Sequence, residues 1–562
     1  MLAILTGCTT FGATTPPHRI TELPGWEAPL TTEHWSGFVE VDKASGTHLF
    51  YVLAMSAHSP STDPIVWWMN GGPGASSLAG MFGENGPLLL AGDSKTLFPN
   101  PYAWNHNANV LFVEFAPGIG NSFCDNSTVG DLPHCSAADR DAGACSPCLA
   151  SDATVAAQSV ILAETLFAGD APLFPKMKGR ALYLAGESYA GVYIPTLAQA
   201  IITTGTGSNA GGLNLHGIWV TDPCTDNVAQ FGYLDLGIDF LFQMGILSQP
   251  LYATLNSTAC SPARTRVGDR VRSIASPACR AAWRSYDLAS AGIGDAVHPA
   301  GIRNLPMYID PLSALGPSGG ADLPGYLGRA DVRAALGATA SKSKVYQLEI
   351  GNNGYPQYTL NYAACNPDPT LAAGTPSMLD VHRFLATAPQ THPDTASNFE
   401  RIIISSGDID PVVSLHGTEK AVAAIGYSIR PGYERRPWFY HAKATPVATL
   451  RVKPRGWGAS LGAVEGASQV GGFTKSYAVA NSAVQLDFVS VRNSGHMVPG
   501  YAPQRAQLIL ERMLLGNKAL APPLTAGWDT AEDAQWYGAN SSGIFADWIN
   551  AAMAIPSDRI EL

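Results

Sequence analysis

The sequence predicts an α/β fold built on a largely parallel sheet, and two observations support this prediction. Short β-rich runs recur along the chain, each closed by a turn, and several are apolar throughout, as strands covered on both faces are. Ala/Leu-rich stretches of helical character lie between them, and such alternation is typical of parallel sheets. The runs are "HLFYVLAMS", "PIVWWMNGG", "NVLFVEFAPG", "RALYLAGES", "GIWVTDP", "RIIISSGD" and "VQLDFVSVRNSGH", and the helical stretches include "SDATVAAQSVILAETLFAG" and "YIPTLAQAIIT".

Composition and charge exclude two classes of protein. The chain has 562 residues, of which 46% are hydrophobic and 14% charged, as is ordinary for a folded protein. Its net charge of -11 argues against a nucleic-acid partner, which would need a concentrated basic surface. No apolar run approaches the roughly 20 residues that span a bilayer, so we expect no membrane span.

The strand rhythm stops between about 226 and 323, where Gly, Pro, Ser and Arg dominate. We therefore expect a core in two parts, 21–225 and 324–520, with an inserted cap at 226–323 and a C-terminal extension at 521–562. "PGYERRPWFYH", residues 431–441, concentrates charged groups and is interpreted as a solvated loop.

Residues 1–20 are interpreted as a signal segment, because "MLAILTGC" starts with apolar residues. The segment is called truncated because it lacks the basic region that normally precedes them. A bacterial lipoprotein site that lipidates Cys8, with a periplasmic address, is the alternative. The first interpretation implies the secretory pathway, with a vacuolar, lysosomal or extracellular destination.

Eight further cysteines make an even set, and four of them crowd into residues 124–148. Disulfides in an oxidising compartment are the favoured interpretation. Cys145 and Cys148 have the spacing of zinc ligands, but no second C-x-x-C or paired histidine follows, so we expect no metal. Asn126, Asn256 and Asn540 begin tripeptides that could accept glycans.

Ser188, in "LAGESYAGVYIP", is the candidate nucleophile. A nucleophile elbow needs a strand before the serine and a helix after it, and Ser188 has both. Ala190 stands where the general G-x-S-x-G pattern has its second glycine. The strict pattern occurs at Ser318 and Ser460, but both lie in Pro/Gly-rich sequence without a leading strand and are interpreted as loops.

A serine nucleophile needs a histidine base and an acid that orients the histidine, and in α/β-hydrolases these follow in the order Ser, acid, His. "RIIISSGDID" ends a strand in Asp408 and Asp410, and "LDFVSVRNSGHM" ends another in His496. Asp408 is interpreted as a residue that holds its turn. His416 follows no strand and is interpreted as a surface histidine.

An oxyanion hole, built from backbone N–H groups, is the remaining need. "WWMNGGPGASS" follows an early strand, and its glycines let the backbone approach a ligand without Cβ obstruction. The Lys-Ser/Thr of a phosphate loop is missing from it. The N–H of Tyr189 should be the second donor.

At these residues the sequence closely resembles the serine carboxypeptidase family. The resemblance runs through "WWMNGGPGASSLAGMFGENGPL", "WNHNANVLFVEFAPGIGNSF", "GESYAGVYIP", "SGDIDPVV" and "NSGHMVPGYAP" and covers about four-fifths of the chain. In this family the elbow typically reads G-E-S-Y-A-G, with alanine at the position of Ala190. The resemblance implies an α/β-hydrolase fold with an inserted cap region and no cofactor.

The resemblance also implies a role for each matching residue. Ser188 is then the nucleophile, His496 the base and Asp410 the orienting acid. Gly72 and Tyr189 supply the oxyanion-hole N–H groups. Asn70, Gly71, Glu84 and Glu187 hold the C-terminal carboxylate of the substrate, provided that the two glutamates share a proton, as close carboxyls tend to do.

The expected function is therefore release of C-terminal amino acids from peptides or proteins through an acyl-enzyme on Ser188, best at mildly acidic pH. The alternatives are acyl transfer from esters to alcohols, and a protective or binding partner whose catalysis is incidental. Acyl-transferring relatives commonly carry Asp before the nucleophile, so Glu187 favours the peptidase. A homodimer stays open.

Two positions depart from the family pattern. The family usually has cysteine at the position of Ala75, so a disulfide from the substrate loop is absent and this loop must be held otherwise. Tyr501 stands near a position where the family commonly has an acidic or amide residue.

Overall fold

The computed structural model describes most of the 562-residue chain. The described residues are 16–124, 148–206, 212–231, 235–257, 260, 276–289, 321–343, 346–350, 358–365, 375–410, 413–441, 468–516, 519–532, 535 and 543–554. Several sites named above lie outside these residues, namely Cys8, Cys135, Cys145, Asn126, Asn540, Ser318 and Ser460.

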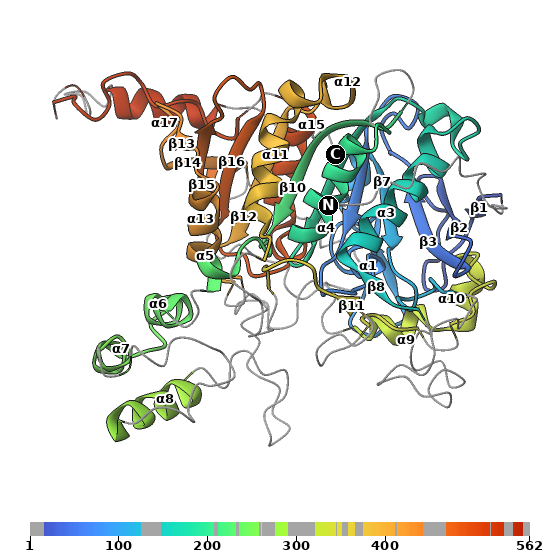
Figure 1. The fold of residues 1–562 in the computed structure, drawn as a ribbon, viewed down its shortest axis with the longest axis horizontal. Coiled ribbons are helices and arrows are strands. Elements are labelled where there is room, and N and C mark those ends of the chain that lie inside the picture. Colours follow the sequence, from blue (N-terminus) through green and yellow to red (C-terminus); the bar gives the residue numbers. More distant parts are fainter. Residues whose placement is uncertain are drawn as a thin grey trace.

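Twelve strands of the described chain form one sheet (Figure 1). From one edge to the other they are β1 (His18–Ile20), β2 (His34–Asp42), β3 (Thr47–Ala54), β7 (Asn109–Glu114), β4 (Ile65–Met69), β9 (Ala181–Glu187), β10 (Asn214–Thr221), β12 (Arg401–Gly407), β16 (Gln485–Val491), β15 (Ser468–Ala478) and β13 (Ser428–Ile429), with β14 (Arg436–His441) also paired to β15. Two small two-stranded sheets pair β5 (Leu88–Leu90) with β6 (Leu97–Pro99), and β8 (Ala150–Ser151) with β11 (Tyr358–Thr359).

The centre of the large sheet is parallel and its edges are antiparallel. Strands β7, β4, β9, β10, β12 and β16 run in one direction, and every neighbouring pair among them is parallel. The edge pairs β1–β2, β2–β3, β3–β7 and β15–β16 are antiparallel. All seven predicted runs lie on strands of this sheet, so the predicted α/β class with a mostly parallel sheet is confirmed.

Two hydrophobic cores cover the two faces of the sheet. Strand β7 shows the alternation, because Leu111 and Val113 belong to one core and Val110 and Phe112 to the other. The first core contains residues of α3 (Asp152–Ala163), α4 (Ala190–Thr203), α11 (Met378–Thr391) and α13 (Leu415–Ala424). The second contains residues of α1 (Leu78–Gly83), α9 (Leu323–Leu327), α10 (Ala330–Ala335), α14 (Val498–Tyr501), α15 (Pro503–Leu514) and α17 (Ile544–Met553).

Three helices below the sheet in Figure 1 have a small hydrophobic core of their own. They are α6 (Asp235–Gln243), α7 (Gln249–Leu255) and α8 (Pro277–Ala289), and they follow α5 (Asn227–Phe231), which leaves the end of β10. Trp283 and Tyr286 of α8 pack in this core beside the Cys260–Cys279 disulfide. These helices lie within residues 226–323, whose role as an inserted cap stays a prediction.

Short elements complete the description. They are α12 (Pro393–Ala396), the 3-10 turns Trp104–His106 and Pro175–Met177, and a π-helical turn Glu164–Ala168 that continues α3.

The interpretation of residues 431–441 as a solvated loop is wrong for their second half. Residues 436–441 form β14, in which Arg436, Trp438 and Tyr440 are buried and alternate with more exposed neighbours. The buried guanidinium of Arg436 donates to the carbonyls of Ala521 and Pro522. These hydrogen bonds compensate part of the cost of burying its charge. The alternating pattern of a half-buried strand was present, but the density of charge concealed it.

The predicted signal segment 1–20 overlaps the described structure at its C-terminal end, and its role stays a prediction. Residues 18–20 form β1, which pairs with β2 at the edge of the sheet, and Ile20 is buried in the core. Residues 1–15 lie outside the described residues.

Three disulfides are formed among the described cysteines: Cys124–Cys148, Cys224–Cys365 and Cys260–Cys279. Cys148 is one of the two residues that the zinc alternative requires, and its sulfur is bonded to another sulfur instead. No described helix is long and apolar enough to cross a membrane.

Candidate active site

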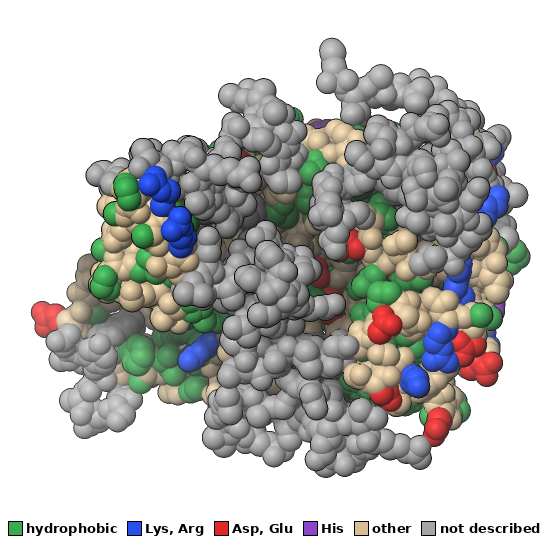
Figure 2. Space-filling model, turned by 90° about the horizontal axis from the view of Figure 1, so that it is seen from below, with side chains coloured by type: hydrophobic (Ala, Val, Ile, Leu, Met, Phe, Trp, Pro, Cys, Tyr) green, Lys and Arg blue, Asp and Glu red, His purple; other side chains and the backbone are tan. Residues whose placement is uncertain are grey.

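Five neighbouring strands are each followed by a polar residue at the same end of the sheet. The strands β4, β9, β10, β12 and β16 are adjacent in this order, and their carboxyl ends lead to Asn70, Ser188, Asp222, Asp410 and His496. The carboxyl ends of parallel strands are where α/β proteins bind ligands. Figure 2, which views the molecule from below, shows a hollow near the middle of this face with hydrophobic and acidic side chains in its walls.

Ser188 stands on a sharp turn between β9 and α4. Its φ of 60° lies in the left-handed region, which is unfavourable for a residue with a side chain and is typical of a nucleophile elbow. A Cβ added at Gly186 would lie 2.6 Å from the methyl carbon of Ala190. The small residue at position 186 is therefore required, and the methyl group of Ala190 fits in the space that remains.

Two backbone hydrogen bonds fix the elbow to the end of β10. The N–H of Ser188 donates to the carbonyl of Thr221 (3.0 Å), and the carbonyl of Ser188 accepts from the N–H of Cys224 (2.9 Å). Ser188 remains partly exposed although residues 182–187 and 189–198 are buried. The nucleophile candidate is thus held rigidly and is accessible.

Asp410 and His496 form a buried pair. Nδ1 of His496 lies 2.6 Å from Oδ2 of Asp410, and both side chains are buried. Burial lowers the pKa of His496, but the charges of Asp410 and Glu84 raise it by more, so its pKa is raised above the usual range. This is the geometry of an orienting acid and a base.

The two other residues weighed for these roles have structural contacts. Oδ1 of Asp408 accepts from the N–H of Asn493 (2.5 Å) and so ties its own turn to the loop that carries His496. Nε2 of His416, on α13, lies 2.6 Å from Oε1 of Gln243 on α6.

The glycine loop after β4 packs directly on the elbow. A Cβ at Gly71 would lie 2.5 Å from the backbone nitrogen of Tyr189 and 2.6 Å from Cβ of Ser188. Only glycine allows this approach. It brings the backbone of Gly71 and Gly72 beside the N–H of Tyr189, where an oxyanion hole requires its donors.

Backbone and side-chain hydrogen bonds hold this loop at the site where the family's cysteine is replaced by Ala75. The N–H of Ser76 donates to the carbonyl of Leu348 (2.7 Å), and the N–H of Ile350 donates to the carbonyl of Gly74 (3.1 Å). The N–H of Gly74 also donates to the hydroxyl of Tyr193 on α4 (3.0 Å). Backbone hydrogen bonds to residues 348–350 thus hold the loop at the place where the disulfide is lacking.

Two buried carboxyls meet one amide next to the elbow. Nδ2 of Asn70 donates to Oε1 of Glu84 (3.0 Å) and to Oε1 of Glu187 (2.8 Å). Oδ1 of Asn70 accepts from Nε1 of Trp68 (2.9 Å) and from the N–H of Gly80 (3.0 Å). Both hydrogens and the oxygen of the Asn70 amide are therefore already engaged.

The glutamates have strongly shifted pKa values. Burial raises the pKa of Glu84 to about 7, against hydrogen bonds from Asn70 and Glu187 and the charge of His496. Burial and the charge of Glu84 raise the pKa of Glu187 well above its usual range. Because Nδ2 of Asn70 donates to both, the two carboxyls lie next to each other, and neighbouring buried carboxyls favour a shared proton. Neither Oε2 atom receives a hydrogen bond from an N–H or O–H donor of the described residues.

Sequence reasoning missed two buried acids at this site. Asp152, at the start of α3, accepts from the hydroxyls of Tyr189 (3.1 Å) and Tyr358 (3.0 Å) and from the N–H of Asn361 (2.6 Å). It thereby fixes the side chain of the residue that follows the nucleophile. Asp222, directly after β10, accepts from the hydroxyl of Ser406 (2.9 Å) and from the N–H of Gly407 (2.9 Å) at the end of β12. Its only signal was its place at the end of the predicted strand "GIWVTDP".

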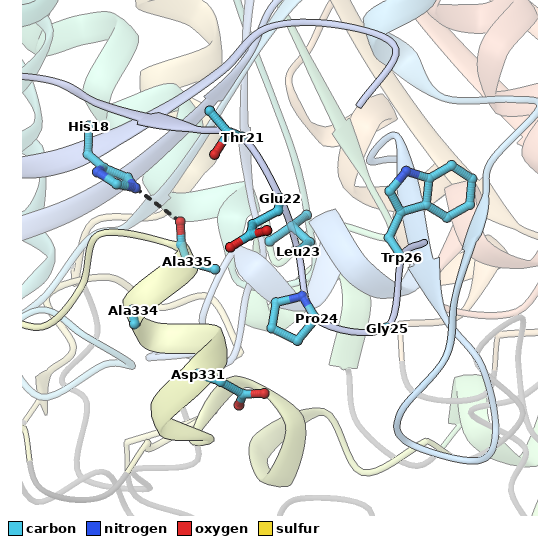
Figure 3. A pocket seen from close by; sticks show the side chains of 10 residues that line it. All are labelled: His18, Thr21, Glu22, Leu23, Pro24, Gly25, Trp26, Asp331, Ala334 and Ala335. Atoms are coloured by element: carbon cyan, nitrogen blue, oxygen red, sulfur yellow. Dashed lines mark hydrogen bonds between the residues drawn. The ribbon is translucent and has the colours of Figure 1, made fainter. Parts of the chain in front are cut away.

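A second hollow lies away from these strand ends (Figure 3). It has a volume of about 630 Å³ and contains none of the predicted site residues. Two of its polar groups are engaged in the fold: Nε2 of His18 lies 3.1 Å from the carbonyl oxygen of Ala335, and Asp331 pairs with Arg329 at 2.6 Å. Among the described residues no group of three or more His, Cys, Asp or Glu side chains could hold a metal ion.

Similarity to known proteins extends over most of the chain. The family model described as serine carboxypeptidase matches residues 24–516. The chain belongs to the serine carboxypeptidase family. Relatives include serine carboxypeptidase-like 25 of Arabidopsis thaliana, 30% identical over 519 residues that cover 89% of this chain and 91% of the relative. Serine carboxypeptidase 1 of Hordeum vulgare is 26% identical over 524 residues, covering 89% and 93%.

A solved structure of a carboxypeptidase shares the fold. The structure of Kex1(Δ)p, a prohormone-processing carboxypeptidase from Saccharomyces cerevisiae, matches with a TM-score of 0.56 at 18% identity and covers 87% of this chain and 94% of that one. This likeness and the strand order confirm the predicted α/β-hydrolase fold.

Proposed function

We propose that the protein is a serine-type carboxypeptidase that removes the C-terminal amino acid of a peptide or protein. The observation that carries the proposal is the pair Glu84 and Glu187, which are buried beside the elbow, joined through the amide of Asn70, and have raised pKa values. A hydrolase that does not recognise a free carboxylate has no evident need for two buried acids at this place, because burying them is costly. Family membership supports the same activity.

The nucleophile, base and acid act in the usual order. Oγ of Ser188 attacks the carbonyl carbon of the last peptide bond while His496 takes the hydroxyl proton, and Asp410 stabilises the imidazolium that forms. The N–H groups of Gly72 and Tyr189 receive the oxyanion. The C–N bond breaks as His496 returns the proton to the leaving amine. Water then attacks the acyl-enzyme by the same route and releases the shortened peptide.

The terminal carboxylate of the substrate needs hydrogen-bond donors, and one of them is present only when a glutamate is protonated. Because the amide of Asn70 already donates to both glutamates, its role is to orient them. The N–H of Gly71 and the carboxyl proton of the Glu84–Glu187 pair then meet the substrate carboxylate. Without that proton, two like charges would repel it.

Two titrations limit the pH range. Peptide hydrolysis falls at low pH as His496 becomes protonated and loses its function as a base. Binding of a free carboxylate falls as pH rises through the pKa of Glu84, about 7, because a carboxyl with a raised pKa is protonated below that value and charged above it. Free-acid substrates should therefore be hydrolysed best between these two limits, and the mildly acidic optimum stays a prediction.

Acyl transfer from an ester to an alcohol is the second candidate, because the same acyl-enzyme could react with an alcohol in place of water. Glu187 before the nucleophile favours the peptidase, as acyl-transferring relatives commonly carry aspartate there. A protective or binding role stays a third alternative. The disulfides favour an oxidising compartment of the secretory pathway, while the exact compartment and a homodimer stay predictions.

The test is release of the free C-terminal amino acid from an N-blocked dipeptide by the protein and by its Ser188→Ala variant, from about pH 4 to 8. We expect release by the protein and a loss of at least about 10³-fold in the variant. Release that survives Ser188→Ala would contradict the assignment. If no peptide is cleaved but an ester donor acylates an added alcohol, the acyltransferase is the function.

A further inference from the structure

Asp152 lies at the start of α3, is buried, and takes no part in the proposed chemistry. The helix does not need this carboxyl as a cap. Oγ of Ser151 accepts from the N–H of Thr154 (3.1 Å), and Oγ1 of Thr154 accepts from the N–H of Ser151 (2.8 Å), so a complete capping box is already present. Some other contact must therefore explain why an acid is buried at position 152.

The hydrogen bonds described for the Asp152 carboxyl are all donated to it, and all come from other segments. The hydroxyl of Tyr189 lies 3.1 Å from Oδ1 and 3.2 Å from Oδ2. The hydroxyl of Tyr358 on β11 donates to Oδ1 (3.0 Å), and the N–H of Asn361 donates to Oδ2 (2.6 Å). A carboxyl offers acceptors for several donors at once, so one side chain joins the elbow to the segment after β11.

Tyr189, whose N–H is a proposed oxyanion donor, follows the strained turn of the elbow. Ser188 has φ 60°, and a residue keeps such a conformation only where its surroundings hold it. The ring of Tyr189 is buried and packs edge to face on the rings of Tyr193 (5.2 Å between centroids) and Tyr358 (6.3 Å). Its hydroxyl is held by Asp152. Because the ring and the N–H belong to the same residue, restraining the ring restrains the direction of the N–H.

The segment 358–365, which donates to Asp152, is itself fixed to the elbow. Its Cys365 forms a disulfide with Cys224, and the N–H of Cys224 donates to the carbonyl of Ser188 (2.9 Å). The segment is thus held in place by a covalent bond as well as by its hydrogen bonds to Asp152. The carboxyl therefore has a fixed position from which to hold the tyrosine that follows the nucleophile.

We propose that Asp152 is a positioning residue for the oxyanion hole: it holds the phenol of Tyr189 and thereby aims the N–H that receives the negative oxygen of the transition state. The inference rests on the proposed serine mechanism but not on the peptide substrate. A misaimed donor weakens binding of the oxyanion, which exists only after the attack of Ser188. Loss of the contact should therefore lower kcat and kcat/KM equally and leave KM unchanged.

The test measures release of nitrophenolate from an N-blocked amino-acid p-nitrophenyl ester. In this reaction Oγ of Ser188 forms a bond to the ester carbonyl carbon, the bond from that carbon to the nitrophenyl oxygen breaks, and water later releases the acid. A peptidase and an acyltransferase would both acylate Ser188 in this way. If the wild type releases no more nitrophenolate than Ser188→Ala, the proposed serine mechanism fails, and this inference fails with it.

The first pair of variants is Asp152→Asn and Asp152→Ala. The amide of asparagine keeps the shape of the carboxyl: its oxygen can accept from the N–H of Asn361 and its NH₂ can donate to the hydroxyl oxygen of Tyr189, so kcat should stay within about threefold of wild type. Alanine releases the phenol, so kcat and kcat/KM should both fall about tenfold, less than the loss of about 10²-fold or more that follows removal of an oxyanion donor.

The second pair, Tyr189→Phe and Tyr358→Phe, decides the question even if the alanine variant does not fold. Each removes one hydroxyl from the same carboxyl, but only Tyr189 carries the oxyanion donor. We expect kcat to fall about three- to tenfold in Tyr189→Phe and to match wild type in Tyr358→Phe. The proposal is overturned if both phenylalanine variants lower kcat equally or not at all. It is also overturned if Asp152→Ala, shown by circular dichroism to be folded, has the wild-type kcat or changes KM alone.

Discussion

At the residue scale, the site depends on ionisable groups that are buried next to one another. Glu84, Glu187, Asp222, Asp410 and His496 are all buried. The sequence predicted four of them through motifs, together with the serine and the glycine loop. It could not predict Asp222, because an aspartate after a strand is indistinguishable from an ordinary turn residue until its neighbours from β12 are known.

The first prediction concerns Glu84, whose pKa of about 7 makes it the first of the pair to ionise. In the wild type, KM for a free-acid dipeptide should rise up to about tenfold per pH unit above pH 7. In Glu84→Gln the carboxyl that titrates near pH 7 is replaced by a neutral amide, so this rise should no longer begin near pH 7. KM for the matching C-terminal amide should be flat in both enzymes. An unchanged rise in the variant would refute the shared-proton account.

At the element scale, the function depends on two turns that touch, the glycine loop after β4 and the elbow after β9. The strands themselves were predictable, because apolar runs closed by turns mark them. Strand β14 was not, since Arg436 is buried in it and a charged residue normally indicates solvent. Nor could the bridge between Ala75 and residues 348–350 be predicted, because backbone hydrogen bonds between distant segments leave no mark in side-chain patterns.

The second prediction tests the contact between the turns. Gly71→Ala should lower kcat/KM by about 10²-fold or more, because its Cβ would lie 2.5 Å from the nitrogen of Tyr189 and force the turns apart. Gly83→Ala is the matched control: its Cβ would meet Leu323 at 3.7 Å, an ordinary contact, and activity should be unchanged. Equal activity of both variants would show that the contact is not required.

At the scale of the whole molecule, one parallel sheet gathers residues from sequence positions 70 to 496 at one end. Pattern and order along the chain predicted this arrangement, because strands β4, β9, β12 and β16 each precede a motif. The described helices within residues 226–323 were not predicted as helices. The sequence predicted only an insertion there, because the series of strands stops. The packing of these helices around Trp283 and the Cys260–Cys279 disulfide depends on contacts between segments of the insertion, which the pattern of a single segment does not reveal.

The third prediction concerns acid stability. His382 on α11 is fully buried, its ring nitrogens have no hydrogen-bond partner among the described residues, and burial lowers its pKa to about 4. The unfolded chain binds a proton at this residue below about pH 6.5, whereas the folded chain does so only below about 4. The stability contributed by this residue is therefore present above pH 6.5 and lost as pH falls toward 4.

His382→Leu removes this linkage. The difference in free energy of unfolding, variant minus wild type, should be about 2–3 kcal/mol larger at pH 4.5 than at pH 7.5, so the variant gains stability relative to wild type in acid. Denaturant titrations at both pH values measure the difference. The control His441→Leu changes an exposed histidine and should show no such dependence. A His382→Leu effect that is equal at both pH values would contradict the assignment of a buried neutral imidazole.

The central claim is that Glu84 and Glu187 make this serine hydrolase recognise a free C-terminal carboxylate. The most direct measurement is the ratio of kcat/KM for an N-blocked dipeptide to that for its C-terminal amide, as a function of pH. Both substrates depend equally on His496, so the ratio isolates carboxylate recognition. We predict a ratio well above one near pH 5 that falls at least about tenfold by pH 8. A ratio that is near one, or that does not change with pH, would contradict the account.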